Sequence, residues 1–155
     1  MSALPEFVAD ASVVAKWYLS DEDDVDHARR VLDDFVSGHI RLTAPEQIVA
    51  EIGSTLTVAA SATRNRIQKN AARAGFYWFL ALPIATVPIR DLGSEAYDLS
   101  EQHSCAFYDA LYVTLAKRRA IPFINADRKL HDRIGHLPGV IWVADYVSLT
   151  DHATN

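Results

Sequence analysis

Four acidic residues of this chain lie where the sequence is otherwise apolar or small: Asp10, Glu51, Asp109 and Asp127. Asp109 is the only charged residue between Cys105 and Val113. A lone carboxylate in such surroundings is unfavourable unless it is paired or bound to a metal ion. Because this arrangement recurs along a small chain, we expect the four carboxylates to meet in the fold. Oxygen ligands of this kind indicate a site for a divalent metal ion.

Each acid also has a purely structural interpretation. Asp10 and Asp127 both precede predicted helices, where an Asp side chain can cap the first turn. Glu51 lies near the edge of the apolar stripe of its helix, where an exposed Glu is common. Asp109 differs, because the neighbouring positions on its own helix face supply no cationic partner. The predicted metal site therefore depends most on Asp109.

The composition is typical of one soluble globular domain spanning residues 1–155, with half of the residues hydrophobic and 23% charged. No apolar run approaches the ~20 residues that span a bilayer, and no secretory signal is visible. The single Cys105 excludes an internal disulfide and a zinc site built from several cysteines. We therefore expect a cytoplasmic protein without a membrane segment. Its net charge of -5 gives no general attraction to nucleic acid.

Short apolar runs alternate with helical patterns along the chain. The predicted strands are Glu6–Asp10, Ile40–Thr43, Ile84–Pro88, Pro122–Asn125 and Val140–Val143. Predicted helices begin near Ser12 and at Pro45, cover Ala28–Phe35, Thr63–Leu80, Leu92–His103 and Ala106–Arg119, and join the last two strands. This alternation is typical of a parallel sheet with helices on both faces. Ligands bind such sheets beyond the carboxyl ends of the strands, where Asp10 and Asp127 fall.

The order and setting of the four acids resemble the PIN-domain family, and specifically the VapC-type toxins of bacterial toxin–antitoxin pairs. The matching segments are Val8–Ser12, Pro45–Glu51, Ala106–Tyr112 and Asn125–Leu130. The most specific is Tyr108-Asp109-Ala110-Leu111-Tyr112, which opens a helix that is apolar nearly all round and therefore predicted to be buried. The resemblance implies a three-layer α/β/α sandwich with a central, mainly parallel sheet. It also implies a Mg²⁺- or Mn²⁺-dependent endoribonuclease, a homodimer, and inhibition by a VapB-type antitoxin.

In such a site, Asp10 and Asp109 are the first candidates for direct metal ligands, because Mg²⁺ takes one or two carboxylates and keeps several waters. Asp127 would complete the coordination or hold a metal-bound water. Glu51 would orient a second water or a second ion. The metal would lower the pKa of the attacking water and neutralise charge developing on the phosphodiester. Because gathered carboxylates repel one another, metal binding should also stabilise the fold.

RNA binding requires further polar groups, and the candidates near the acids are Ser12, Lys16 and Asn125. Ser12 either hydrogen-bonds a ligand or phosphate or caps the first turn of its helix. Asn125 stands where the family usually has Thr or Ser, and it can hydrogen-bond water or a carboxylate.

Basic residues occur in three further groups: Arg66, Lys69 and Arg73, which share one predicted helix face with Asn70; Lys117-Arg118-Arg119; and Arg128-Lys129. Each group can bind RNA, or it can be an ordinary solvated helix face or a helix C-terminus that complements the dipole. The alternative to a ribonuclease is a catalytically silent PIN-like module that binds RNA or protein without cutting. Loss of an acid would favour that alternative, whereas this chain carries all four.

Overall fold

The computed structural model describes residues 3–149, and these contain one five-stranded sheet in which all neighbouring strands are parallel. Its strands are β1 (Glu6–Ala9), β2 (Arg41–Pro45), β3 (Ala85–Val87), β4 (Phe123–Asn125) and β5 (Val140–Trp142). Their order across the sheet is β3-β2-β1-β4-β5. Val8 of β1 pairs with Thr43 on one side and with Phe123 on the other. The carboxyl ends of β1 and β4 therefore meet at one edge of the sheet.

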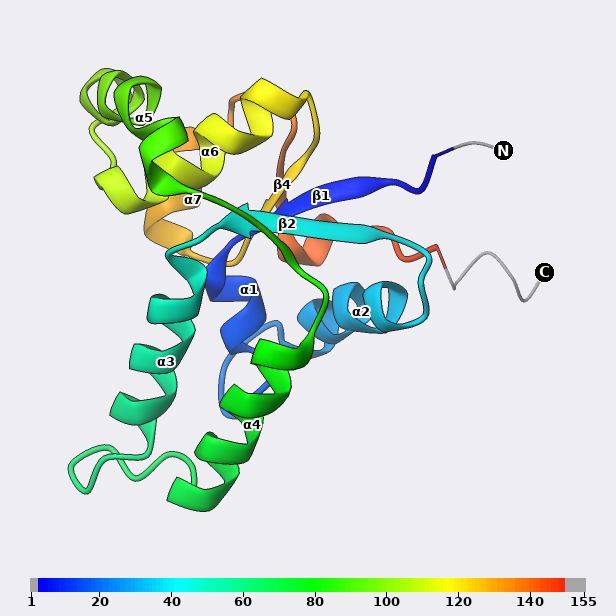
Figure 1. Ribbon diagram of the computed structural model, residues 1–155, viewed down its shortest axis with the longest axis vertical. Coiled ribbons are helices and arrows are strands. Elements are labelled where there is room, and N and C mark those ends of the chain that lie inside the picture. Colours follow the sequence, from blue (N-terminus) through cyan, green and yellow to red (C-terminus); the bar gives the residue numbers. More distant parts are fainter. Residues whose placement is uncertain (1–2, 150–155) are drawn as a thin grey trace.

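Helices cover both faces of this sheet (Figure 1). One face carries α1 (Ala11–Ala15), α2 (Val25–Val36), α3 (Ile48–Ala59) and α4 (Lys69–Ala81). The other carries α5 (Ile89–His103), α6 (Phe107–Arg119) and α7 (Arg128–Ile134), and a 3-10 helix, Val143–Asp145, follows β5. The chain runs from β1 to β3 in one direction and then returns to β4 and β5. Right-handed crossovers accordingly place the two sets of helices on opposite faces. The fold is the predicted three-layer α/β/α sandwich.

Helix α6 has more buried residues than any other described helix. It packs against β1, β2 and β4 on one side and against α5 on the other. Its residues from Ala110 through Ala116 are consequently all buried. This confirms the burial predicted from its apolar surroundings. No helix between residues 3 and 149 is both long and apolar enough to cross a membrane.

Two predicted helix boundaries are wrong. Pro45 does not begin a helix; it ends β2 and pairs with Val87, because its fixed φ is also compatible with extended backbone at a strand end. The helix predicted from Thr63 begins only at Lys69. The preceding segment turns instead, with Asn65 at φ 47°. Local turn chemistry prevails there over the helical pattern.

A buried carboxylate fastens the C-terminal segment to α2. Asp34 is fully buried and accepts hydrogen bonds from the Tyr146 hydroxyl at 2.6 Å, the Ser148 hydroxyl at 3.1 Å and the Leu149 backbone N–H at 2.9 Å. A buried carboxylate is tolerated only when such donors replace the water it loses. Asp34 therefore links two segments that are far apart in the sequence.

The substitution Tyr146→Phe is expected to destabilise the protein by about 1.5–3 kcal/mol, the usual contribution of a hydrogen bond to a charged group. The phenyl ring keeps its edge contact with Phe7, so the hydroxyl alone is removed. Tyr97→Phe is the matched control, because Tyr97 is exposed on α5. Urea unfolding of the three proteins measures the difference. Equal loss in both variants would contradict the role of Asp34.

Candidate active site

Two of the four acids lie at the carboxyl edge of the sheet, as the strand pattern predicts. Asp10 follows β1, and its backbone N–H donates to the carbonyl of Ile124 in β4 at 2.9 Å. Asp10 caps α1 through Ser12 N, at 3.0 Å, and Asp127 caps α7 through Leu130 N, at 3.1 Å. Asp10 and Asp127 can therefore cap their helices and still belong to one acidic site. The caps hold both carboxylates at the end of neighbouring strands.

The other two acids come from the first turns of α3 and α6. Glu51 is half-buried, and its Oε1 accepts a hydrogen bond from the Tyr112 hydroxyl at 3.1 Å. Asp109 is also half-buried and lies one turn before Tyr112 on α6. Helix N-termini carry partial positive charge, which favours carboxylates at these positions. The interpretation of Glu51 as an exposed residue beside the apolar stripe of its helix is therefore wrong.

Electrostatic interactions link the four carboxyl groups to one another. The pKa of Asp10 is raised to about 7, first by burial and in addition by the charges of Asp109 and Glu51, against the hydrogen bonds from Ser12. Burial also raises the pKa of Asp109 to about 6, with Asp127 adding to the effect. The pKa of Glu51 is raised first by burial and then by Asp109. Asp10, Glu51 and Asp109 therefore affect one another, and Asp127 joins them through Asp109.

The chemistry of this cluster fits a hard divalent cation. Its donors are oxygens, two of its carboxyls are partly protonated near neutral pH, and a cation would relieve their repulsion. Within residues 3–149, however, no three His, Cys, Asp or Glu side chains are arranged as ligands of one ion. Mg²⁺ requires fewer protein ligands than that, since it keeps several waters.

The three residues predicted to bind substrate have internal partners. The Ser12 hydroxyl donates to Asp10 and accepts from Ala126 N at 2.9 Å, so it joins the loop after β4 to the acid after β1. Lys16 is 7% exposed and forms an ion pair with Glu22 at 3.1 Å. Asn125 is fully buried, and its Nδ2 lies near His131 and the Ile141 carbonyl. In this conformation neither Lys16 nor Asn125 faces solvent.

The predicted basic face of the fourth helix is only partly formed. Arg66 lies before α4 and binds Asp21 through two hydrogen bonds of 2.9 Å, and Glu22 at 3.0 Å. The prediction that Arg66 shares a helix face with Lys69 and Arg73 is therefore wrong, because α4 begins only at Lys69. Both of those residues are exposed on α4, and the Arg73 guanidinium lies 5.2 Å from the centre of the Tyr77 ring.

The other two basic clusters are divided between ion pairs and the surface. Arg118 pairs with Glu95 at 2.9 Å and Arg119 with Glu6 at 2.8 Å. These contacts favour the structural interpretation for two members of that cluster. Arg128 stacks over the Trp142 ring at 3.9 Å, close in sequence to Asp127.

The sequence pattern does not identify Gln47 as part of this region. Gln47 is buried between α3 and α6, and its Nε2 donates to the Tyr108 carbonyl at 2.8 Å. The available signal was its spacing: Gln47 lies four residues before Glu51 and therefore on the same helix face. Polar residues one turn from a site acid merit attention for this reason.

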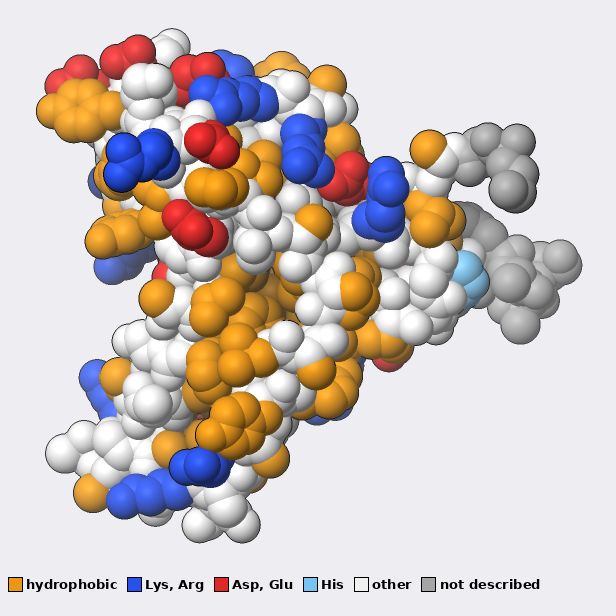
Figure 2. All heavy atoms as spheres, in the orientation of Figure 1, with side chains coloured by type: hydrophobic (Ala, Val, Ile, Leu, Met, Phe, Trp, Pro, Cys, Tyr) orange, Lys and Arg blue, Asp and Glu red, His pale blue; other side chains and the backbone are white. Residues whose placement is uncertain are grey.

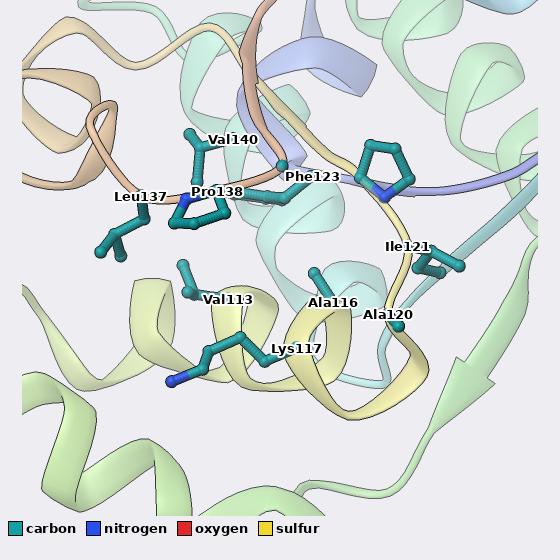
Figure 3. Close-up of a pocket in the computed structure, with 11 residues that line it drawn as sticks. Val113, Ala116, Lys117, Ala120, Ile121, Phe123, Leu137, Pro138 and Val140 are labelled. Carbon is teal, nitrogen blue, oxygen red and sulfur yellow. The ribbon is translucent and has the colours of Figure 1, made fainter.

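A separate cavity of about 410 Å³ lies away from the acids (Figure 3). It is bounded by α6 residues, including Val113 and Ala116, and by Phe123, Pro138 and Val140. Phe123 and Val140 begin their strands, so this cavity lies at the amino end of β4 and β5. The acids lie at the carboxyl end. The cavity is apolar apart from Lys117 and offers no set of groups for hydrolysis.

Comparison with known proteins identifies the family. The sequence profile of the PIN domain matches residues 7–137. This match covers most of the chain and includes all four acids. The protein belongs to the PIN-domain family.

One relative matches part of the sequence, and solved structures share the fold at low identity. Ribonuclease VapC12 from Mycobacterium tuberculosis is 36% identical over 58 residues, which are 37% of this chain and 43% of that protein. The match thus spans less than half of the relative's length. The structure of VapC20 from M. tuberculosis, a sarcin–ricin loop cleaving toxin, has a TM-score of 0.60 at 17% identity, covering 81% and 93% of the two chains. A toxin–antitoxin complex from Klebsiella pneumoniae has a TM-score of 0.57 at 12% identity, covering 90% and 98%.

The substitution Asp10→Asn is expected to stabilise the protein at neutral pH and to change little near pH 4. The pKa of Asp10 is raised from 3.8 to about 7 on folding, so the folded state binds more protons between these values. The free energy of unfolding of the wild type therefore falls by a few kcal/mol as the pH rises across this window. Asparagine keeps the cap acceptor without the charge. Urea titrations of both proteins in EDTA test this; a difference independent of pH would contradict it.

Proposed function

We propose that this protein is a metal-dependent endoribonuclease and the toxin of a VapBC-type toxin–antitoxin system. The observation that carries the proposal is the mutual electrostatic interaction of four carboxyl groups at the carboxyl edge of the sheet. The match to the PIN domain and the name of the relative, Ribonuclease VapC12, support it.

Asp10 and Asp109 are proposed as direct ligands of Mg²⁺ or Mn²⁺, and Asp127 is proposed to complete the coordination or to hold a metal-bound water. A bound ion would supply an activated water at neutral pH and would neutralise charge on the phosphodiester. Glu51 is proposed to orient a water, and the Tyr112 hydroxyl holds its carboxylate in place at 3.1 Å. Ser12 has a corresponding role at Asp10, because its hydroxyl joins that carboxylate to the backbone of Ala126.

The substitution Asp109→Asn is expected to lower RNA cleavage at least about 100-fold, the usual range for removing a group that acts in the chemical step. It should not lower thermal stability, because it removes a repelled, half-buried charge. Asp98→Asn is the matched control, since Asp98 is exposed on α5. Cleavage of total RNA and of a sarcin–ricin loop oligonucleotide is measured with Mg²⁺, with Mn²⁺ and with EDTA.

Equal cleavage by wild type and Asp109→Asn would remove the catalytic assignment of this residue. RNA binding without any cleavage by the wild type, with either metal present, would instead favour the catalytically silent module.

The proposed protein partner is a VapB-type antitoxin, and a groove between α3 and α4 offers a surface for it. The groove has a volume of about 1020 Å³ and is lined by Val49, Leu56, Phe76 and Tyr77 among others. Figure 2 shows hydrophobic side chains gathered around this hollow. Lys69 and Arg73 add positive charge to its lining. Apolar patches of this kind mark protein interfaces, and the charges favour a partner with an acidic flank.

The substitution Tyr77→Glu is expected to weaken antitoxin binding at least tenfold while leaving RNA cleavage intact. It places a negative charge in the apolar groove, which none of the four acids lines. Tyr97→Glu is the matched control, because Tyr97 is similarly exposed, at 60% against 55%, but lies on α5. The measurement is the dissociation constant for the protein encoded by the adjacent gene, together with rescue of growth arrest. Undiminished rescue of Tyr77→Glu would contradict this location.

We also propose that the protein acts in the cytoplasm, where its RNA substrate lies, and that it forms a homodimer. Both parts of the proposal rest on the resemblance to VapC-type toxins. Light scattering after gel filtration of the isolated protein measures the oligomeric state.

A further inference from the structure

Gln47 occupies the junction between the two helices that carry Glu51 and Asp109. It directly precedes α3, and its side chain is only 6% exposed. Its Nε2 donates to the carbonyl of Tyr108 at 2.8 Å, in the residue before Asp109. Its own backbone carbonyl accepts from the N–H of Glu51 at 2.9 Å. One residue thus contacts the first turns of both helices.

The Gln47 amide also acts on the second carboxylate. It favours the charged form of Glu51 and so lowers the pKa of that group, as does the Tyr112 hydroxyl, which donates to Glu51 at 3.1 Å. A primary amide has two N–H donors, so one can serve the Tyr108 carbonyl and the other the Glu51 carboxylate. Glu51 is therefore held from both α3 and α6.

The oxygen of the same amide has no partner. Gln47 Oε1 is buried and makes no hydrogen bond to any residue between 3 and 149. A buried acceptor without a donor opposes folding and offsets much of what the N–H contacts contribute. An apolar side chain of the same length would avoid that cost. The amide thus contributes little to net stability, while its donors fix the geometry of two acids.

We infer that Gln47 is a positioning residue of the acidic site, holding Glu51 and the first turn of α6, with Asp109, in a fixed relation. The inference rests on the proposed ribonuclease function, because the value of this geometry is in arranging the acids for hydrolysis. A positioning residue changes the rate of the chemical step far more than substrate binding, since misplacement of reacting groups is felt mainly in the transition state.

The test substitutes Gln47→Met, which keeps the length of the side chain and removes both donors and the unpaired oxygen. We expect kcat for RNA cleavage to fall about tenfold with KM changed less than about twofold. The melting temperature should not fall, because the buried oxygen without a donor is also removed. Gln102→Met is the matched control, on the exposed surface of α5, and should leave kcat and KM unchanged.

A second variant separates the donors from the oxygens. Gln47→Glu keeps the acceptor atoms but supplies no amide N–H, and it places another carboxylate beside Glu51. Its kcat should fall at least as far as that of Gln47→Met. Full activity of either variant would overturn the inference. So would a loss of activity that merely parallels the unfolded fraction, because that would show a structural role only.

Backbone hydrogen exchange over Ala110–Val113 separates this inference from the proposed function. If Gln47 holds the start of α6, exchange there is at least several-fold faster in Gln47→Met than in wild type and in Gln102→Met. This expectation does not depend on whether the wild type cuts RNA. An inactive wild type would therefore contradict the proposed ribonuclease function, while the exchange rates would still test the role of Gln47. Unchanged exchange over this segment would overturn the inference.

Discussion

The burial of carboxylates beside one another at one edge of the sheet is the constraint to which the surrounding structure responds. Asp10 is 5% exposed, and both its burial and the charges of Glu51 and Asp109 oppose its ionisation. Helix capping does not require these side chains to be close together, because each cap involves only its own helix. Parallel pairing of β1 with β4 instead brings the two strand ends together, and crossover helices add two more acids. The cluster is thus a consequence of topology.

Neighbouring donors hold the acids at this edge. Asp10 accepts from the backbone and hydroxyl of Ser12, Asp127 accepts from the backbone at the start of α7, and Glu51 accepts from Tyr112. Buried α6 makes the last of these contacts rigid, because the sheet and α5 leave its residues little room to move. Such support is what a site requires when its groups must be placed to within a fraction of an ångström. Structural and chemical roles therefore coincide in the same residues.

Strand ends and the apolar helix could be predicted from the sequence, because burial and periodicity are properties of short segments. That information places Asp10, Asp109 and Asp127 in the correct elements. It does not show which partner a polar side chain will meet: Lys16 forms an ion pair with Glu22, which lies beyond the end of the helix that precedes Lys16. Likewise, the role of Gln47 depends on a carbonyl 61 residues away. Long-range pairs of this kind leave no periodic signal in the sequence.

The positive charges of the protein show why the acidic cluster matters for a polyanionic substrate. Lys16, Arg66, Arg118 and Arg119 are each occupied by carboxylates in residues 3–149. With a net charge of -5, the protein as a whole has no general attraction for RNA. A divalent ion at the acids would reverse the local field where the phosphodiester must approach. On the proposed function, the same ion would therefore account for both the stability of the cluster and its affinity for substrate. The main role of Asp10 would then be to bind the ion, and its helix cap would hold its carboxylate in place for that role.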